Sequence, residues 1–265
     1  MASIWAALVT YSFFWYENAW RAQLDPYRGR KLRAMIFSGV LSSILSVALI
    51  VVTIPAGVIR SLWEPKEISP ASPVIILVHG LFHNPSAWLI FRRRLGRAGF
   101  KNIFLVSYRS FFTTFEKTVE KLERFTAEVR RRVPGQPVYL IGHSLGGLVC
   151  RVYAERAGEG AAPAAVITLG CPHQGTKVAA FHVGKLASSL LYRGPLFTGL
   201  ESEAGRLRCA GLAFVSPVDN MVLPFEALKV PYDGWVYRET IPMSHTSMIY
   251  SRSVAQSVVQ VLKGL

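Results

Sequence analysis

One serine sits in a pattern that can turn a hydroxyl into a nucleophile. The stretch from Val138 to Gly158 reads VYLIGHSLGGLVCRVYAERAG, with Ser144 in the pentapeptide Gly-His-Ser-Leu-Gly. An apolar run precedes the serine and a helix-like pattern follows it, which predicts a sharp strand-to-helix turn. Such a turn exposes the hydroxyl at the end of a sheet, and the helix N-terminus favours a developing negative charge. An ordinary glycine-rich turn with an N-capping serine is the alternative.

The aspartates limit the choice of an acid for this chemistry. Asp219 follows the apolar run LAFVS, so it is expected in a loop just past the carboxyl end of a strand, where the acid of a triad should stand. Asp25 lies in a basic segment, on the far side of a long apolar run. Asp233, in the turn-like sequence PYDGW, and Glu226 are the alternatives. The residues therefore favour Asp219.

Five stretches together carry a family resemblance. LVHGLF, GHSLGG, TLGCPHQGT, SPVDNMVLP and MSHTSM occur in this order between Pro73 and Leu265. In this set the chain resembles the α/β-hydrolase family, and within it bacterial lipases and esterases. The resemblance implies an α/β-hydrolase fold with a mainly parallel sheet, flanking helices and a small cap or lid. It is highly specific for the fold and the nucleophile, and weakly specific for the substrate.

The resemblance also implies which histidine is the base. The family order Ser, Asp, His points to His245, in a loop between the last expected strand and the closing helix. His79 precedes a glycine at a strand end and is expected to be structural, and His143 is expected to point away from the triad. His83 and His173, in loops near the expected site, are the alternative bases, and His182 lies in the irregular region of residues 176–208.

Two backbone N–H groups are needed to hold the oxyanion that forms on an ester carbonyl. Leu145, directly after the serine, is expected to supply one of them. The resemblance implies that Leu81, just after His-Gly in LVHGLF, supplies the second. The Gly-Gly-Gly variant of this motif is absent from the sequence. The predicted oxyanion hole therefore consists of Leu81 and Leu145.

Elements that position these residues can be read from the hydrophobic pattern. Strands are expected at VIILVHG, NIFLVSY, PVYLIG, AAVITLG, LAFVSPVD and GWVYRET. Helices are expected at AWLIFRRRLGRAGF, TTFEKTVEKLERFTAEVRRR, LGGLVCRVYAERAG and SMIYSRSVAQSVVQVLKGL. Continuous apolar strands that alternate with helices predict an α/β fold with a mainly parallel sheet. Residues 176–208 are less regular, and their apolar side chains either pack on the core or form a cap that receives an acyl chain.

The N-terminal part of the chain has a different character. Residues 34–59, AMIFSGVLSSILSVALIVVTIPAGVI, carry no charge, and about 20 apolar residues suffice for a helix to cross a bilayer. A buried core helix and a cleaved signal peptide are the alternatives, but the run is long for a signal peptide and no small-x-small site follows it. The aromatic-rich residues 4–16 are expected in the membrane interface, or as a short first span.

Basic residues before the long apolar run predict its orientation. They are Arg21, Arg28, Arg30, Lys31 and Arg33. Only Asp25 opposes them, and the positive-inside rule therefore places this side in the cytoplasm. We predict a membrane-anchoring segment over residues 1–62, a linker over 63–73 and a hydrolase domain over 74–265. That domain is expected on the periplasmic, extracytoplasmic side of a bacterial inner membrane.

Composition narrows the partners further. A net charge of +14 favours anionic partners, and the apolar run favours a membrane over nucleic acid. Cys150, Cys171 and Cys209 lack metal-ligand spacing and are typical of small core residues, with a Cys171–Cys209 disulfide as the alternative. No motif predicts a metal or a cofactor, and no obligate protein partner is indicated. Some lipases that the chain resembles bind calcium, but no oxygen-ligand loop supports this here.

These features predict a membrane-anchored lipase or esterase that cleaves carboxylic esters, of lipids in particular, through an acyl-enzyme on Ser144. The nearest alternative is an acyltransferase with the same acyl-enzyme, because the two differ only in whether water or an alcohol takes the acyl group. An amidase and an inactive binding module are the remaining alternatives.

Overall fold

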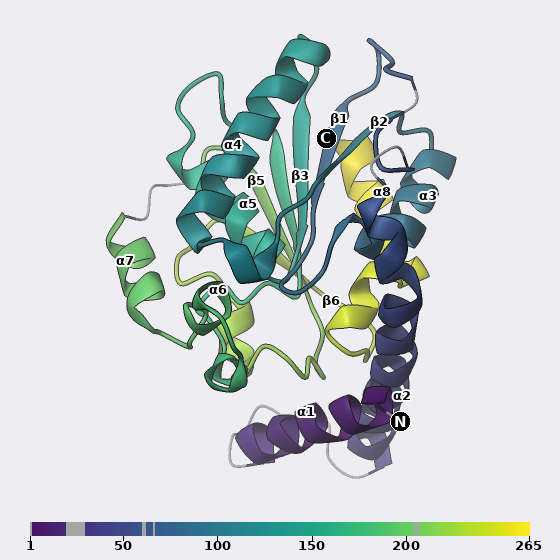
Figure 1. Ribbon diagram of the computed structural model, residues 1–265, viewed down its shortest axis with the longest axis vertical. Helices are drawn as coiled ribbons and strands as arrows, with labels where there is room; N and C mark the ends of the chain where they lie inside the picture. The colour runs from purple at the N-terminus through teal and green to yellow at the C-terminus, as the bar shows by residue number, and fades with distance from the viewer. Residues whose placement is uncertain (1, 20–29, 60–61, 66, 204–206) are drawn as a thin grey trace.

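A parallel sheet with helices on both faces forms the centre of the computed structural model in Figure 1. The structure describes residues 2–19, 30–59, 62–65, 67–203 and 207–265. The strands are β1 (Val74–Val78), β2 (Asn102–Val106), β3 (Val138–His143), β4 (Ala165–Leu169), β5 (Ala210–Val215) and β6 (Trp235–Glu239). They pair in the order β2-β1-β3-β4-β5-β6, and each pairing is parallel. The predicted fold class is confirmed.

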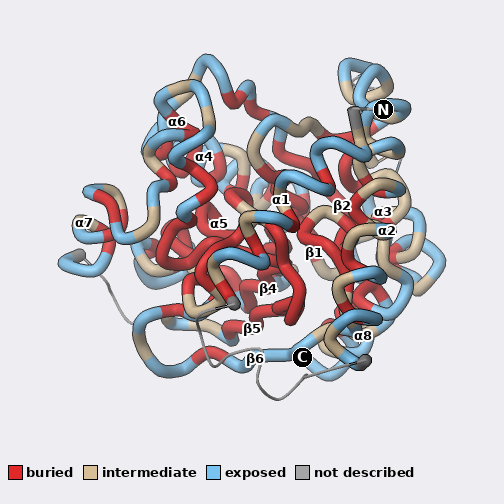
Figure 2. Tube along the Cα trace, turned by 90° about the horizontal axis from the view of Figure 1, so that it is seen from below, coloured by how far each residue is buried: buried red, intermediate tan, exposed pale blue. Residues whose placement is uncertain are grey.

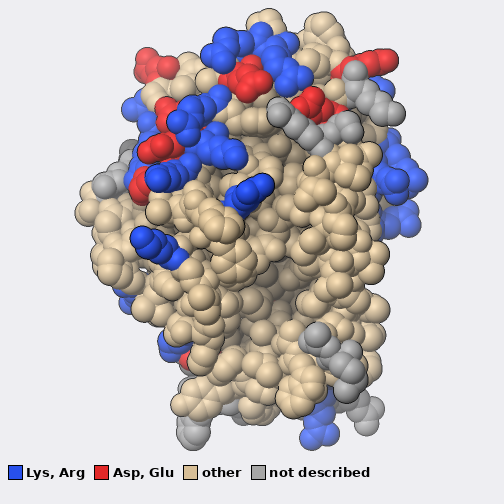
Figure 3. Space-filling model, in the orientation of Figure 1, with Lys and Arg blue, Asp and Glu red and all other residues tan. Residues whose placement is uncertain are grey.

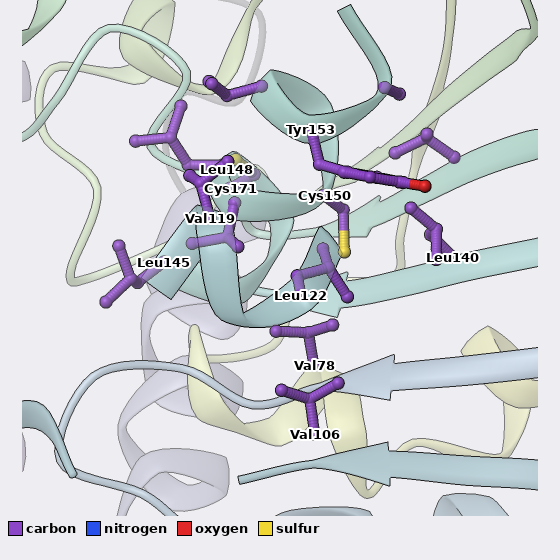
Figure 4. Close-up of a cluster of buried hydrophobic side chains, with 14 of the residues drawn as sticks. Val78, Val106, Val119, Leu122, Leu140, Leu145, Leu148, Cys150, Tyr153 and Cys171 are labelled. Carbon is purple, nitrogen blue, oxygen red and sulfur yellow. The ribbon is translucent and has the colours of Figure 1, made fainter. Parts of the chain in front are cut away.

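The two faces of the sheet bury alternate side chains, because successive residues of a strand point to opposite sides. Ile76 and Val78 of β1 pack with the helices α4 (Phe115–Arg132) and α5 (Leu145–Arg156), and Figure 4 shows part of this cluster. Ile75 and Leu77 pack with α3 (Leu89–Arg97) and α8 (Arg252–Gly264) on the other face. Burial on both faces explains why β1 reads as an uninterrupted apolar run. Seen along the strands, the buried sheet lies at the centre of the molecule (Figure 2).

Short helical elements connect the strands and build the irregular region. Within residues 74–265, the described 3-10 turns outside that region are η4 (Pro85–Trp88), η5 (Ser110–Phe112), η7 (Phe225–Leu228) and η8 (Thr246–Ile249). The region of residues 176–208 contains η6 (Lys177–Phe181), α6 (Lys185–Ser188) and α7 (Pro195–Glu203). Leu186 and Leu190 are buried in the core, whereas Phe181, Val183 and Leu191 are exposed. Some of its apolar residues thus pack on the core, and others face outward.

Two N-terminal helices lie against the domain. The helix α1 (Ala2–Ala19) lies beneath the end of the sheet, and α2 (Arg30–Thr53), continued by η2 (Ile54–Val58), runs along one side (Figure 1). Within the described residues, the segment Lys31–Val58 has the length and apolar composition needed to cross a membrane. One side of α2 contacts the domain, while the other side exposes Phe37, Leu41, Leu45, Val51 and Val52. Asp25, Arg21 and Arg28 lie outside the described residues.

The segment expected as a linker packs on the domain. Trp63 is buried in the cluster that includes α3, and its indole N–H donates to the Ala56 carbonyl over 3.0 Å. The Asn102 side chain donates to the carbonyl oxygens of Ser69 and Ser72. The segment is therefore held along the edge of the sheet.

The cysteines carry no disulfide. Cys150 and Cys171 are buried, Cys209 is half-buried, and all three are free thiols. The alternative Cys171–Cys209 bridge is therefore wrong. Burial raises the pKa of the Cys209 thiol to about 11 and keeps this group in its neutral form. These residues act as small core side chains, as the sequence suggested.

Candidate functional site

Ser144 occupies a strained turn between β3 and α5. Its φ of 54° and ψ of −127° lie in a region that L-residues seldom adopt. The strand ends one residue before the serine and the helix begins one residue after it, as predicted. The Ser144 N–H donates to the Leu169 carbonyl at the end of β4 over 2.9 Å. The turn thus holds the serine at the carboxyl edge of the central strands.

The glycines on either side of Ser144 are required by close backbone contacts. A Cβ on Gly146 would lie 2.2 Å from the Val78 carbonyl oxygen, and one on Gly142 would lie 2.4 Å from the carbonyl carbon of Gly146. No side chain can be accommodated at such distances without a backbone shift. The pentapeptide pattern therefore reflects how tightly α5 packs against β1 and β3.

Asp219 and His245 form a buried pair. The His245 Nδ1 atom lies 2.8 Å from the Asp219 Oδ2 atom, and both side chains are almost fully excluded from solvent. The other oxygen, Oδ1, accepts the backbone N–H groups of Met221 and Val222, each over 2.9 Å. A carboxylate accepts hydrogen bonds only, so Nδ1 carries the hydrogen and Nε2 is left as an acceptor. Such an imidazole has the tautomer that a general base needs.

The end of β4 connects the serine with this pair. Leu169 accepts the Ser144 N–H, and a Cβ on the next residue, Gly170, would lie 3.0 Å from His245 Nδ1 and 3.1 Å from Asp219 Oδ2. The structure therefore gathers Ser144, Asp219 and His245 around one strand end. Within the described residues no contact joins His245 to Asp233 or Glu226, the alternative acids.

His143 differs from its expected orientation. The ring does not point away from the base, because its Nε2 atom lies 3.2 Å from the His245 carbonyl oxygen and the two imidazole centroids are 4.8 Å apart. Burial lowers the pKa of His143 well below 6.5, so the ring is neutral and its Nε2–H can donate to that carbonyl. His143 thus supports the backbone of the base loop.

The remaining histidines have other surroundings. His173 contacts the hydroxyl of Thr168 and the guanidinium of Arg151. Burial lowers the pKa of His83 to about 4, and the half-buried His182 lies edge-on to the Phe82 ring. Among the described contacts, none brings these three imidazoles to Asp219. His245 is therefore the histidine that the structure joins to the predicted acid.

His79 is fully buried in the turn after β1. Its Nδ1–H donates to the Gly80 carbonyl over 2.9 Å, and its Nε2 accepts the Tyr108 N–H over 3.3 Å. Protonation of His79 at Nε2 would place this new N–H group against the Tyr108 N–H. Desolvation by burial lowers the pKa of His79 to about 3. The structural role expected for this residue agrees with these bonds.

Acid should destabilise the fold through His79. Because its pKa is about 3 in the folded chain and 6.5 ordinarily, the unfolded chain binds the proton first, and stability present above pH 6.5 is lost as the pH falls. The loss from this one group is about 1.4 kcal/mol per pH unit. We expect His79→Gln to lose less free energy of unfolding than the wild type between pH 7 and pH 5, measured by denaturant titration. Identical losses in both proteins would contradict this assignment.

The two backbone N–H groups predicted to hold an oxyanion belong to Leu145 and Leu81. Leu145 is the first residue of α5, where N–H groups have no partner within the helix. The turn after β1 passes beside the serine, since a Cβ on Gly80 would lie 3.0 Å from the Ser144 Cβ. The Phe82 N–H is taken by the Ser110 hydroxyl over 2.9 Å. In the described part of the chain the Leu81 N–H donates to no group, so it remains available.

Asn220 is a residue of this site that the sequence did not reveal. Its Oδ1 atom accepts the His245 N–H over 3.1 Å, and its Nδ2 donates to the Thr10 hydroxyl over 2.6 Å. The only available signal was its place directly after the acid.

The described residues contain no group of three or more His, Cys, Asp or Glu side chains that could hold a metal ion.

Comparisons with known proteins agree with this architecture. Among solved structures, the mature lipase BlEst2 of Bacillus licheniformis has a TM-score of 0.62 at 18% identity, covering 74% of this chain and 94% of that one. Lipase B of Aspergillus fumigatus has a TM-score of 0.60 at 14% identity, over 76% of this chain and 55% of that one. The lin2722 gene product of Listeria innocua has a TM-score of 0.55 at 16% identity, over 73% of this chain and 95% of that one. At such identities the similarity shows the fold alone.

The sequence itself also identifies a family. No curated protein matches the chain. A family model described as the alpha/beta hydrolase family matches residues 75–254, which is more than half of the chain. The matched range contains the Ser144 turn, Asp219 and His245. The chain therefore belongs to the alpha/beta hydrolase family.

Proposed function

We propose that the protein hydrolyses carboxylic esters of fatty acids through an acyl-enzyme on Ser144. The observation that carries this proposal is the buried Asp219–His245 pair beside the strained Ser144 turn. An imidazole whose Nδ1–H is held by a carboxylate presents Nε2 as the base that a serine hydroxyl requires. Strain at a residue of this kind is typical of a functional site.

In the first half of the reaction, Ser144 Oγ attacks the ester carbonyl carbon and His245 Nε2 takes the hydroxyl proton. The negative charge moves to the carbonyl oxygen, where the N–H groups of Leu81 and Leu145 stabilise it. The carbon–oxygen bond to the alcohol then breaks, and His245 gives the proton to the leaving alcohol. Asp219 stabilises the imidazolium while it holds that proton.

In the second half, a water molecule attacks the acyl-enzyme. His245 takes one proton from the water, and the same two N–H groups hold the second oxyanion. The bond to Ser144 Oγ breaks, the serine regains the proton from His245, and the carboxylic acid leaves. Each residue returns to its starting protonation state.

An apolar groove supports a lipid-like acyl group. It has a volume of about 500 Å³ and lies between α1 and η6. Its apolar walls come from Phe13, Tyr16, Val178, Phe181 and Leu223. Leu223 directly follows Val222, whose N–H is bound by Asp219, so the groove adjoins the acid loop. We propose that this groove takes part of the acyl chain, with residues 176–208 acting as the cap.

Exposed apolar side chains on α1 and α2 support membrane association. Trp5, Leu8 and Trp15 of α1 are exposed, as are the apolar residues on the outer side of α2. Among the described residues on the face shown in Figure 3, most Lys, Arg, Asp and Glu gather towards the end with α4, and few lie over the half with α1 and α6. We propose that residues 1–62 anchor the protein to a membrane, with the hydrolase domain of residues 74–265 on the extracytoplasmic side. Exposed apolar surface of this kind is typical of membrane contacts.

The test is ester hydrolysis by cell fractions. Membranes and soluble fraction from cells that produce the intact protein are assayed with 4-nitrophenyl esters from acetyl to palmitoyl. We expect the activity in the membrane fraction, with kcat/KM rising by about tenfold or more from acetyl to octanoyl, since each buried methylene contributes about 0.8 kcal/mol. In spheroplasts, added protease should remove the activity without lysis.

For each part of the proposal, one experimental outcome would contradict it. A preference for the acetyl ester would contradict the acyl-chain groove. Activity that resists protease until the spheroplasts are lysed would contradict the extracytoplasmic side. Adding an alcohol acceptor tests the transferase alternative, because an acyltransferase would form a new ester where a hydrolase releases mainly free acid.

A further inference from the structure

The helices α1 and α2 between them touch both loops that carry the proposed acid and base. These loops are the acid loop, residues 216–223, and the base loop, residues 240–247. Each is connected by hydrogen bonds to one of the two N-terminal helices. The helices therefore contact the domain at the edge where Ser144 lies.

The acid loop is bound by α1. The Tyr11 hydroxyl donates to the Val218 carbonyl over 2.9 Å, and Asn220 Nδ2 donates to the Thr10 hydroxyl over 2.6 Å. The same Asn220 accepts the backbone N–H of His245 through its Oδ1 atom. Val218 is fully buried against Tyr11 and Phe14 in one apolar cluster. Thr10 is therefore joined to the base through a single side chain.

The base loop is bound by α2. The Ser244 N–H donates to the Ser42 hydroxyl over 2.9 Å, and the Ser247 hydroxyl donates to the Ser42 carbonyl over 2.8 Å. The Ser38 hydroxyl donates to the Pro242 carbonyl over 3.0 Å, one helical turn earlier. Ser42 thus holds the residues on both sides of His245.

We propose that α1 and α2 together position the proposed triad, with Thr10 and Ser42 as positioning residues. This inference rests on the proposed function of Ser144, Asp219 and His245. His245 has no regular secondary structure to fix it, since it precedes the 3-10 turn η8. Its backbone is held by Asn220 and His143, and its neighbours are held by Ser42. A small displacement of a catalytic group can reduce the rate by about 100-fold.

The proposal predicts a selective loss of kcat in the full-length protein. Thr10→Val keeps the shape of the side chain but leaves Asn220 Nδ2 without its acceptor. Ser42→Ala removes the acceptor of the Ser244 N–H. We expect each change to lower kcat for 4-nitrophenyl butyrate by about tenfold or more, with KM changed less than twofold, because substrate contacts are retained. Thr10→Ser, which keeps the hydroxyl, should restore kcat.

A matched control lies one turn further along α2. The Ser46 hydroxyl is buried and donates to the Ser43 carbonyl of its own helix over 3.1 Å. Ser46→Ala should keep the wild-type kcat although it removes a buried hydroxyl from the same helix. A merely structural role of α2 would make Ser42→Ala and Ser46→Ala alike in kcat and in thermal unfolding.

Ser144→Ala, measured in parallel, separates the two proposals. If it is inactive while Thr10→Val and Ser42→Ala keep the wild-type kcat, the positioning role is overturned and the proposed function stands. If Ser144→Ala keeps the wild-type kcat, the proposed function fails, and the positioning role fails with it. Loss of kcat in Thr10→Val with recovery in Thr10→Ser supports the inference.

Discussion

Replacement of Ser144 by alanine is expected to lower kcat for every ester by about 10⁴-fold or more. The Ser144 hydroxyl oxygen is the atom that would form the acyl-enzyme, with the neighbouring Asp219–His245 pair as its proposed activator. The remaining rate would come from direct attack by water on an ester carbonyl that the N–H groups of Leu81 and Leu145 still polarise. A serine-directed phosphonate should label the wild type and leave the variant unlabelled.

Ser144→Gly should be equally inactive and more stable. Glycine adopts a φ of 54° without a steric penalty, whereas both serine and alanine carry a Cβ in this conformation. Release of this strain should raise the free energy of unfolding of the glycine variant by about 1–3 kcal/mol above that of the alanine variant. Denaturant titration of the two inactive proteins measures the difference. Equal stabilities would show that the turn is unstrained, and an active alanine variant would exclude Ser144 as the nucleophile.

Much of the fold could be predicted because its determinants are local. Strands such as β1 and β3 are buried on both faces, so they read as continuous apolar runs. The Ser144 turn was recognisable because Gly142 and Gly146 are forced by backbone contacts that tolerate no side chain. Asp219 was predicted as the acid from its place just past a strand, and the structure joins it to His245. Parallel strands bring such loops to one edge without any further signal.

The features that could not be predicted depend on contacts between distant parts of the chain. The position of His143 against His245 joins residues 102 apart in sequence, and no pattern near either residue encodes it. The docking of the N-terminal helices was hidden by their apolar composition, which is typical of a membrane span. A signal was nevertheless present, since Ser38, Ser42 and Ser46 recur every four residues and form one polar stripe on α2. Such a stripe indicates a helix side that contacts protein rather than lipid.

Asp219→Asn is expected to lower kcat by about 10⁴-fold while leaving the fold intact. The effect follows from the different partners of the two carboxylate oxygens, since Oδ2 is the nearer to His245 Nδ1, at 2.8 Å against 3.2 Å for Oδ1. Oδ1 accepts two backbone N–H groups, from Met221 and Val222, so the amide oxygen of the variant must take this place. The amide NH₂ group then faces His245 Nδ1 and can only donate to it. The imidazole hydrogen is thereby forced onto Nε2, the atom that should receive the serine proton.

Asp233→Asn is the matched control, because it makes the same chemical change at the exposed aspartate first weighed as an alternative acid. It should keep the wild-type kcat. If Asp219→Asn were inactive only because it unfolds, its denaturation midpoint would fall together with kcat. The two backbone bonds to Oδ1 argue against this, since an amide oxygen still accepts both N–H groups, although more weakly than a carboxylate oxygen does. A stable, inactive Asp219→Asn and an active Asp233→Asn would therefore assign the loss to the tautomer of His245, whereas the reverse pattern would move the acid to Asp233.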